Sequence, residues 1–354
     1  MAPLPKERVQ RALAFQFTGL DYLGPLTVKN PGTYESYKKR WIDLLTCFTT
    51  GAIHLELVPD CTAESALNAL KRFISRRGTP EMILSDNAGQ FGKASKALQH
   101  IWEEKVCEEI IEGMSKFFSD KEIKWKNIPE CSPWVGGFYE RLVGLVKRAI
   151  KKTLWRATIS DDQLHTLICM IEGILNNRPL LSISGDNIED YKTLCPADFI
   201  APGSQLNLPP SDMEKQQDPD YHPNPKAEKE LTSLYSRIQK KLDNFWKIWN
   251  THYLQQLRET HMHSHSFKRK KGQVTREPQV GEVTLIKDVS PRATWKLGRI
   301  EKVYHGEDGA VRFAQIKFPS GNVTRRGVQD LVPLELELGN SDQDTKGHLL
   351  TCFT

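Results

Sequence analysis

The sequence predicts a mixed α/β domain that is followed by a long helix and a small β-barrel. Strand patterns open the chain, and strands then alternate with helices up to about residue 200. This order is typical of a mixed sheet flanked by helices. A stretch rich in Pro and polar residues at 201–226 predicts a linker. Beyond it, one long amphipathic segment precedes short strands separated by turn residues, as in small barrels.

The first three strands are predicted to form a meander. Residues 15–28 give the first strand, with the turn Leu23-Gly24-Pro25 inside it. Residues 39–58 give two further strands that meet at Thr50-Gly51. In the third strand Ile53, Leu55 and Leu57 alternate along the chain, so they fall on one face.

Helices and strands alternate after the meander. Thr62 is a good N-cap because its hydroxyl can accept a hydrogen bond from the first helical turn, and Gly78-Thr79-Pro80 ends this helix. The elements that follow are a strand at 82–85, a helix at about 93–118, a strand at 123–126, a helix at about 138–156 and a helix at 160–177.

The C-terminal region begins with a predicted helix at about 227–258. Its apolar residues recur every three or four positions, which suits packing on its own chain better than a dimer seam. Short strands follow at 281–287, 295–304, 311–318 and 322–326. The predicted parts are an α/β core at 8–200, a linker at 201–226, a helical and basic segment at 227–272, a barrel at 273–336 and a tail at 337–354.

Composition excludes several classes of protein. The chain has 354 residues, of which 39% are hydrophobic and 26% charged, as in globular proteins. No apolar run approaches the roughly 20 residues of a membrane span, so no membrane partner is expected. The 7 cysteines are scattered without a Cys-x-x-Cys pair, which argues against a disulfide framework or a zinc module. The net charge of +5 weakly indicates an anionic partner.

Three acidic residues stand where an unused carboxylate would be costly. Asp21 follows an apolar strand segment, Asp86 directly follows the strand at 82–85, and Glu140 lies in the first turn of the predicted long helix. Such positions can converge at one sheet edge, and carboxylates are preferred ligands of Mg²⁺ and Mn²⁺. Each acid alone, like Asp43 in the second strand, is better explained as a solvated carboxylate, or for Glu140 as a favourable charge at a helix N-terminus.

A basic stripe follows Glu140 along the same predicted helix. Glu140, Lys147 and Lys151 agree in direction within about 20° at 3.6 residues per turn, and Gly144 and Arg148 share this face. An acid followed by positive charge suits a metal ligand beside a docked DNA backbone. A solvated charged face is the alternative, and periodicity alone favours it.

Six motifs follow one another along the chain. They are Phe17-Thr-Gly-Leu-Asp21-Tyr-Leu-Gly-Pro-Leu26, the segment 45–58, Leu84-Ser-Asp86-Asn-Ala-Gly-Gln-Phe91, Pro133-Trp-Val-Gly-Gly-Phe-Tyr-Glu140, Leu175-Asn-Asn-Arg-Pro-Leu180 and Leu194-Cys-Pro-Ala-Asp-Phe199. Together they resemble the integrase core of BEL/Pao-type LTR retrotransposons. The C-terminal helix and residues 280–334 also look like the tail of these integrases, so the resemblance covers roughly residues 10–335.

The resemblance implies an RNase H-like fold with a D,D,E triad on Asp21, Asp86 and Glu140, and an SH3-like C-terminal barrel. The separations of 64 and 53 residues match BEL/Pao elements. It further implies two Mg²⁺ or Mn²⁺ ions held by the triad, and phosphodiester transesterification in 3′-end processing and strand transfer. Such a polynucleotidyl transferase would bind double-stranded DNA, act as a homo-oligomer and work in the nucleus, with a cytoplasmic particle stage if the element is active.

The chain also departs from that family. It lacks the His/Cys zinc module that usually precedes the core, which predicts a polyprotein fragment, a truncated copy or a host-adopted gene. Two other functions therefore stay open. One is a catalytically inactive, host-adopted nucleic-acid-binding or interaction protein. The other is an RNase H-like nuclease without joining activity.

Further basic residues are candidates for contacts to DNA. The alternating His261, His263 and His265 are expected in a flexible linker rather than a metal site. The run 268–271 fits a nuclear import signal or a DNA contact as well as it fits solvated charge. With the barrel residues, the predicted nucleic-acid-binding set is Lys147, Arg148, Lys151, Lys268, Arg269, Lys270, Lys271, Trp295, Lys296, Arg299, Arg325 and Arg326.

Overall fold

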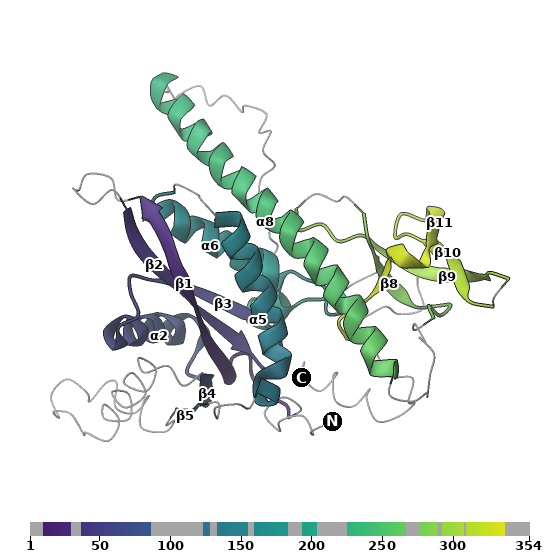
Figure 1. The fold of residues 1–354 in the computed structure, drawn as a ribbon, viewed down its shortest axis with the longest axis horizontal. Coiled ribbons are helices and arrows are strands. Elements are labelled where there is room, and N and C mark those ends of the chain that lie inside the picture. The colour runs from purple at the N-terminus through teal and green to yellow at the C-terminus, as the bar shows by residue number, and fades with distance from the viewer. Residues whose placement is uncertain are drawn as a thin grey trace. The chain divides into compact units, whose positions relative to one another are not determined.

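The computed structural model describes residues 10–29, 37–85, 123–127, 133–154, 159–182, 193–203, 225–266, 277–288, 292–307 and 309–336. The chain forms two compact units, one of residues 1–176 with 199–245 and the other of residues 177–198 with 246–354 (Figure 1). None of the described helices is long and apolar enough to cross a membrane. The predicted helix at 93–118, most of the predicted linker and the run 268–271 lie outside the described residues.

The first unit contains a five-stranded mixed sheet with the order β3-β2-β1-β4-β5. Strands β1, β2 and β3 form the predicted antiparallel meander, and β4 and β5 run parallel to β1. The mixed sheet is flanked by helices, which confirms the predicted fold class of this part of the chain. The bounds are β1 Phe17–Lys29, β2 Tyr37–Cys47, β3 Ile53–Val58, β4 Met82–Ser85 and β5 Lys124–Asn127.

The predicted turn inside the first strand is a break in pairing rather than a chain reversal. The register between β1 and β2 shifts between Leu23 and Leu26, and the Gly24–Pro25 peptide bond is cis. Gly24 lies so close to the Trp41 indole that any Cβ would overlap the ring. A glycine is therefore required at this position, because it lets the bulky indole pack directly on the strand backbone.

Helix α2, Ala63–Arg77, begins and ends where the sequence predicts. The Thr62 hydroxyl accepts a hydrogen bond of 3.2 Å from the Ser65 amide, and Gly78 follows the last turn with a φ of 89°. The apolar face of α2 packs on the sheet through Phe73, whose ring meets Phe15 edge-on with centroids 5.4 Å apart. The capping residues and the apolar face of α2 thus indicate the same helix.

Helix α5, Pro133–Leu154, starts earlier than predicted, at Pro133 instead of Phe138. Proline suits the first helical position because its missing N–H has no partner there in any helix. The Gly-Gly pair that follows carries a propensity cost, but the helix continues through it. Helix α6, Asp161–Asn176, matches its predicted bounds closely.

Side chains of α6 close the open edge of the sheet at β3. The Asn176 amide accepts a hydrogen bond from the Ile53 N–H (2.8 Å) and donates one to the Ile53 carbonyl (2.7 Å). Glu172 accepts a third from the Leu55 N–H (2.8 Å). These contacts satisfy backbone groups that a further strand would otherwise pair, so the edge is covered without a sixth strand.

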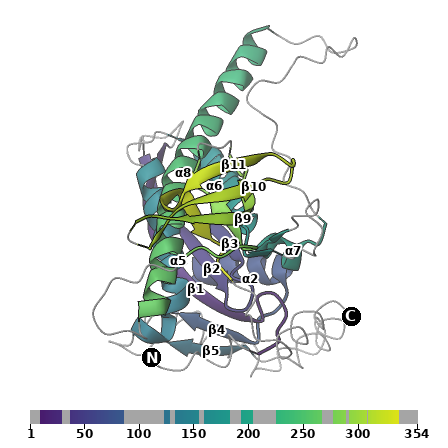
Figure 2. The same cartoon turned by 90° about the vertical axis from the view of Figure 1, so that its right-hand side faces the viewer.

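The second unit contains a five-stranded antiparallel sheet with the order β11-β10-β9-β8-β12. Its strands β9, β10 and β11 run side by side in Figure 2. The four predicted strands are present, and β12 is an additional one. The bounds are β8 Val283–Ile286, β9 Leu297–His305, β10 Val311–Lys317, β11 Val323–Gly327 and β12 Leu331–Pro333, with a short second sheet of β6 Leu181–Ser182 and β7 Thr193–Leu194.

Helix α8, Pro225–Ser266, is longer than predicted and contributes to both units. It continues through His261, His263 and His265, so the expectation of a flexible linker there is wrong. Residues two apart on a helix point about 200° apart, so the three histidines do not share one face. The residues of α8 in the second unit carry Trp249, which is fully buried.

A buried ion pair joins distant segments of the second unit. Arg178 is fully buried, and its Nε lies 3.2 Å from a Glu335 carboxylate oxygen. The Tyr253 hydroxyl donates to the same oxygen at 2.8 Å. Three segments far apart in sequence therefore converge on one carboxylate.

We predict that Asn176→Ala lowers the free energy of unfolding by about 1–3 kcal/mol, because it leaves the buried Ile53 N–H and carbonyl without partners. Urea unfolding followed by circular dichroism measures this. Thr166→Ala, at an exposed position of the same helix, is the matched control and should change stability by less than about 0.5 kcal/mol. Equal effects of the two substitutions would contradict the role assigned to Asn176.

Candidate active site on the central strand

Asp21 lies on β1, the central strand of the mixed sheet, and meets helix α5. Its Oδ2 atom is 2.5 Å from the Nζ atom of Lys147, and its Oδ1 accepts a hydrogen bond of 2.7 Å from the Tyr22 amide. Both side chains of the ion pair are about a quarter exposed, at 26% for Asp21 and 25% for Lys147. The carboxylate therefore holds a cation and remains within reach of solvent.

Parallel pairing of β1 with β4 aligns Asp21 with the end of β4. Leu20 pairs with Ser85, the last residue of β4. Asp21 and Asp86 directly follow these two partners in the sequence, and Asp86 lies outside the described residues. The register therefore places Asp21, within β1, one residue beyond the level at which β4 ends.

Glu140 is the eighth residue of α5, and its side chain lies outside the described residues. The predicted place in the first helical turn is wrong, because the helix begins at Pro133 and has no acid in its first turn. A favourable interaction with the helix N-terminus falls off within that turn and does not explain this glutamate. Glu140 precedes Lys147 by seven residues, which places both on one side of the helix.

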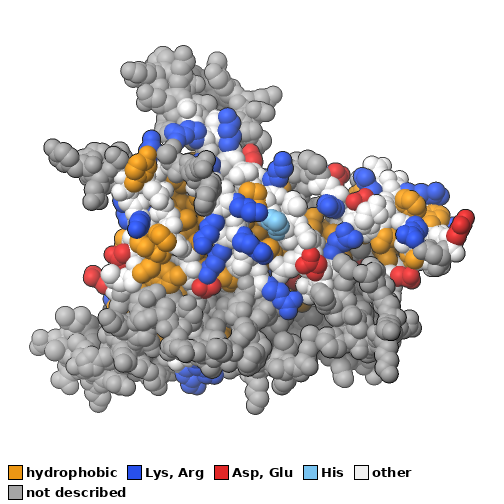
Figure 3. Space-filling model, viewed as in Figure 1, with side chains coloured by type: hydrophobic (Ala, Val, Ile, Leu, Met, Phe, Trp, Pro, Cys, Tyr) orange, Lys and Arg blue, Asp and Glu red, His pale blue; other side chains and the backbone are white. Residues whose placement is uncertain are grey.

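The described part of α5 has the predicted amphipathic character. Its apolar side chains Leu142, Val143, Val146, Ala149 and Ile150 are buried. On the other side, Arg148 and Lys151 are exposed, and the Arg148 Nε donates to the Gly144 carbonyl at 3.2 Å. Figure 3 shows Lys and Arg side chains grouped near the middle of the visible face, in the region where Figure 1 draws α5.

The chemistry around Asp21 fits a cation. A carboxylate oxygen of Asp21 already accepts the Lys147 ammonium, which stands in for a positive charge at this position. Carboxylates are hard oxygen ligands of the kind that Mg²⁺ and Mn²⁺ take. Within the described ranges no group of three or more His, Cys, Asp or Glu side chains could hold a metal ion. The other two acids of the predicted triad are among the side chains not described.

The opposite face of the sheet carries a second row of polar residues. Tyr22, Asp43 and Glu56 pair in register across β1, β2 and β3. Asp43 is only 3% exposed, so the expectation that it is a solvated carboxylate is wrong. Burial raises the pKa of Asp43 to about 7, although Tyr22 and the Arg72 guanidinium of α2 act in the opposite direction.

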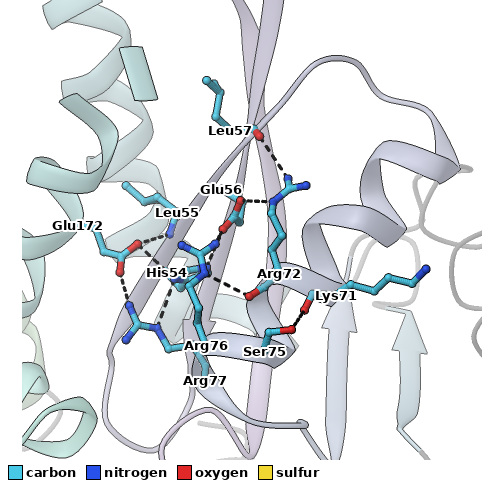
Figure 4. Close-up of polar contacts among 10 residues, drawn as sticks. All are labelled: His54, Leu55, Glu56, Leu57, Lys71, Arg72, Ser75, Arg76, Arg77 and Glu172. Atoms are coloured by element: carbon cyan, nitrogen blue, oxygen red, sulfur yellow. Dashed lines mark hydrogen bonds and ion pairs between the residues drawn. The ribbon is translucent and has the colours of Figure 1, made fainter. Parts of the chain in front are cut away.

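A network of charged side chains surrounds His54 on this face (Figure 4). His54 is fully buried, with Nδ1 3.2 Å from Glu172 and Nε2 3.3 Å from Glu56. Three arginines of α2 complete the network: Arg72 and Arg76 pair with Glu56, and Arg77 pairs with Glu172. Burial lowers the pKa of His54, although Glu172 acts to raise it.

Sequence reasoning missed this network. It placed Ile53, Leu55 and Leu57 on one face of β3, and the residues between them, His54 and Glu56, are buried as well. The alternating pattern reports one apolar face and does not show that α2 covers the other. The available signal was the spacing of Arg72 and Arg76, which are four residues apart on one side of α2 and could be matched to Glu56 on β3.

The predicted nucleic-acid-binding residues of the second unit have different surroundings. Trp295 packs against three rings, Trp246, Trp249 and Tyr253, with centroids 5.0–5.9 Å away. Lys296 lies 2.5 Å from an Asp288 oxygen and Arg326 lies 3.9 Å from it.

Arg325 and Arg299 complete this set. Arg325 is exposed and stacks on the Tyr304 ring at 4.4 Å. Arg299, on β9, is partly buried. A role of all these residues in binding DNA stays a prediction.

The structure defines a protein with a five-stranded mixed sheet flanked by helices and an acidic residue, Asp21, on the central strand of that sheet. A family model described as a family of unknown function (DUF5641) matches residues 233–334. A search of curated proteins found no match.

Among solved structures, the chain is similar to a chain of the simian T-cell lymphotropic virus intasome in complex with the PP2A regulatory subunit B56 gamma. The identity is 13% and the TM-score 0.36, over 94% of this chain and 84% of that one. It is also similar to the HTLV-2 integrase catalytic core in complex with magnesium (trimeric form), with 18% identity and a TM-score of 0.31, over 50% of this chain and 95% of that one. The catalytic core of BIV integrase gives 16% identity and a TM-score of 0.30, over 52% and 93%.

We predict that Asp43 makes the stability of the protein fall as pH rises from about 4 to about 7. The folded protein keeps a proton on Asp43 over this range, whereas the unfolded chain, with a pKa near 3.8, has lost it. Asp43→Asn should therefore be more stable than the unmodified protein at pH 8, by on the order of a few kcal/mol, and should lose this advantage at pH 4.

Urea unfolding of both proteins between pH 4 and pH 8 measures this difference. Asp162→Asn, at an exposed position of α6, is the control, and its stability should follow that of the unmodified protein at each pH. A constant stability difference between Asp43→Asn and the unmodified protein across the range would show that Asp43 keeps an ordinary pKa.

Proposed function

We propose that this protein is a retrotransposon-type integrase, a metal-dependent polynucleotidyl transferase that cuts and joins DNA. The observation that carries the proposal is the register of β1 and β4. It pairs Leu20 of β1 with Ser85, the last residue of β4. Asp21 follows Leu20 within β1, and Asp86 is the residue after Ser85 in the sequence. Helix α5 packs on β1 and brings Lys147 to Asp21, with Glu140 two turns earlier on that helix.

In this proposal Asp21, Asp86 and Glu140 would hold two divalent cations, Mg²⁺ or Mn²⁺. Bound ions would activate the attacking oxygen and stabilise the leaving oxygen of an in-line displacement. The chain holds Asp21 on β1, beside β4 and against α5. The exposed Arg148 and Lys151 are suited to contact the phosphate backbone beside the acids.

The remaining parts extend the proposal to DNA binding and assembly. We assign the antiparallel sheet of the second unit to an SH3-like barrel, because its strand order places the last strand beside the first and a short 3-10 turn, Val328–Asp330, precedes it. The stacked Arg325–Tyr304 pair gives this sheet an exposed cationic group for a DNA backbone. We further propose a BEL/Pao-type element as the source, a homo-oligomer as the active form and the nucleus as the place of action.

A strand-transfer assay on short DNA duplexes with Mn²⁺ tests the proposed function. The unmodified chain should produce cleaved and joined products. Asp21→Asn, Asp86→Asn and Glu140→Gln should each reduce joining by at least about a hundredfold, because each removes a ligand of the ions that stabilise the transition state. Asp162→Asn, an exposed acid of α6 in the same unit, is the matched control and should join DNA normally.

Other outcomes of this assay support other functions. Cleavage without joining would indicate a nuclease. Binding of DNA with no chemistry in the unmodified chain, and unchanged binding in the three variants, would indicate a host-adopted DNA-binding protein.

A further inference from the structure

The ion pair between Asp21 and Lys147 joins two residues that each have a different proposed task, and the ion pair prevents both tasks. Asp21 is a proposed ligand of a divalent cation, and Lys147 belongs to the basic stripe proposed to contact DNA phosphates. While Nζ of Lys147 stays 2.5 Å from Oδ2 of Asp21, neither residue is free for its task.

We propose that Lys147 is a built-in counter-ion of Asp21 that a divalent cation displaces, and that this displacement releases the lysine toward a phosphate. This inference rests on the proposed function, because it takes Asp21 as a metal ligand. Lys147 is then a positioning residue. Its ammonium is paired with Asp21 before a metal ion binds and is released when the ion binds.

Both oxygens of the Asp21 carboxylate have partners within the chain. Oδ1 accepts from the Tyr22 amide at 2.7 Å and Oδ2 holds Lys147, so an incoming cation meets an oxygen that is already neutralised. The partial exposure of both side chains lets a hydrated ion enter and lets the ammonium leave. Arg148 in the same stripe instead donates to the Gly144 carbonyl of its own helix. Lys147 is the residue of the stripe that pairs with an acid among the residues that the structure describes.

Competition for one carboxylate has two thermodynamic consequences. The metal affinity is lower than it would be without Lys147, because binding must break the ion pair. A phosphate that captures the released ammonium favours the metal-bound state, and by linkage the metal must strengthen phosphate binding by the same factor. For a partly exposed pair, the competition should weaken metal binding by about two- to fivefold.

Titration of the full chain with Mn²⁺, followed by the electron paramagnetic resonance signal of free Mn²⁺, tests the competition directly. Lys147→Met should bind Mn²⁺ about two- to fivefold more tightly than the unmodified chain. Lys151→Met removes the same charge one helical turn further along α5 and should change the affinity less. Asp21→Asn should weaken binding strongly, which would place the ion at Asp21.

A second measurement uses the unmodified chain and does not depend on the folding of any variant. Acetylation of lysines by an activated ester, quantified by mass spectrometry, reports how accessible each amine is. Saturating Mg²⁺ should raise the rate at Lys147 several-fold and leave the rate at Lys151 nearly constant.

The two experiments separate failure of the inference from failure of the proposed function. If Asp21→Asn weakens Mn²⁺ binding but Lys147→Met binds like the unmodified chain, and Mg²⁺ does not change acetylation of Lys147, the counter-ion role is wrong and the metal site stands. If the unmodified chain binds no Mn²⁺, or Asp21→Asn binds it equally well, the proposed metal site is wrong and the counter-ion role fails with it.

Discussion

The pairing of β1 with β4 is the constraint on which the proposed active site depends. Asp21 could be reached by α5 in many arrangements, but the register of Leu20 with Ser85 determines where Asp21 on β1 lies relative to the end of β4. A slip of one residue would turn every side chain of the strand to the other face, because side chains alternate along a strand. Buried residues on both faces, Leu20 toward α2 and Leu44 on the other side, resist such a slip. The position of Asp21 is therefore maintained by the core and does not require a ligand.

The sheet is covered on both faces, and this explains where its charged residues lie. Asp21 faces α5 and remains partly exposed, whereas Tyr22 and its partner Asp43 face the side of α2, where Tyr22 is partly buried and Asp43 is buried. On that side, Glu56 and Glu172 are compensated by arginines of α2, so a buried histidine and two glutamates are accommodated in paired form. The two faces thus separate a network of paired charges from a partly exposed carboxylate that is paired with one lysine.

The sequence predicted those helices and strands whose bounds depend on residues close to them in the chain. The meander, the Thr62 cap, the bounds of α6 and four strands of the second sheet follow from alternation, capping residues and turn residues near each element. What the sequence could not show depends on contacts between distant segments. The burial of Asp43 and His54 depends on α2 covering the sheet, and the role of Asn176 depends on its match to the free edge of β3. Arg178 shows the same limit, because its partner Glu335 lies more than 150 residues away in the chain. Of the proposed site, the sequence predicted the acids, and the structure added the pairing of Asp21 with Lys147.

Iron-mediated cleavage of the backbone tests most directly whether the edge at Asp21 binds a divalent cation. Fe²⁺ replaces Mg²⁺ at oxygen-ligand sites, and with ascorbate and peroxide it cleaves the chain next to the bound ion. If the proposed metal site is right, we expect cuts in β1 near Asp21, just after Ser85 and in α5 near Glu140. Excess Mg²⁺ should suppress all of these cuts, and Asp21→Asn should lack them. Cuts confined to other segments, or a pattern unchanged in Asp21→Asn, would contradict a metal site at the junction of β1, β4 and α5.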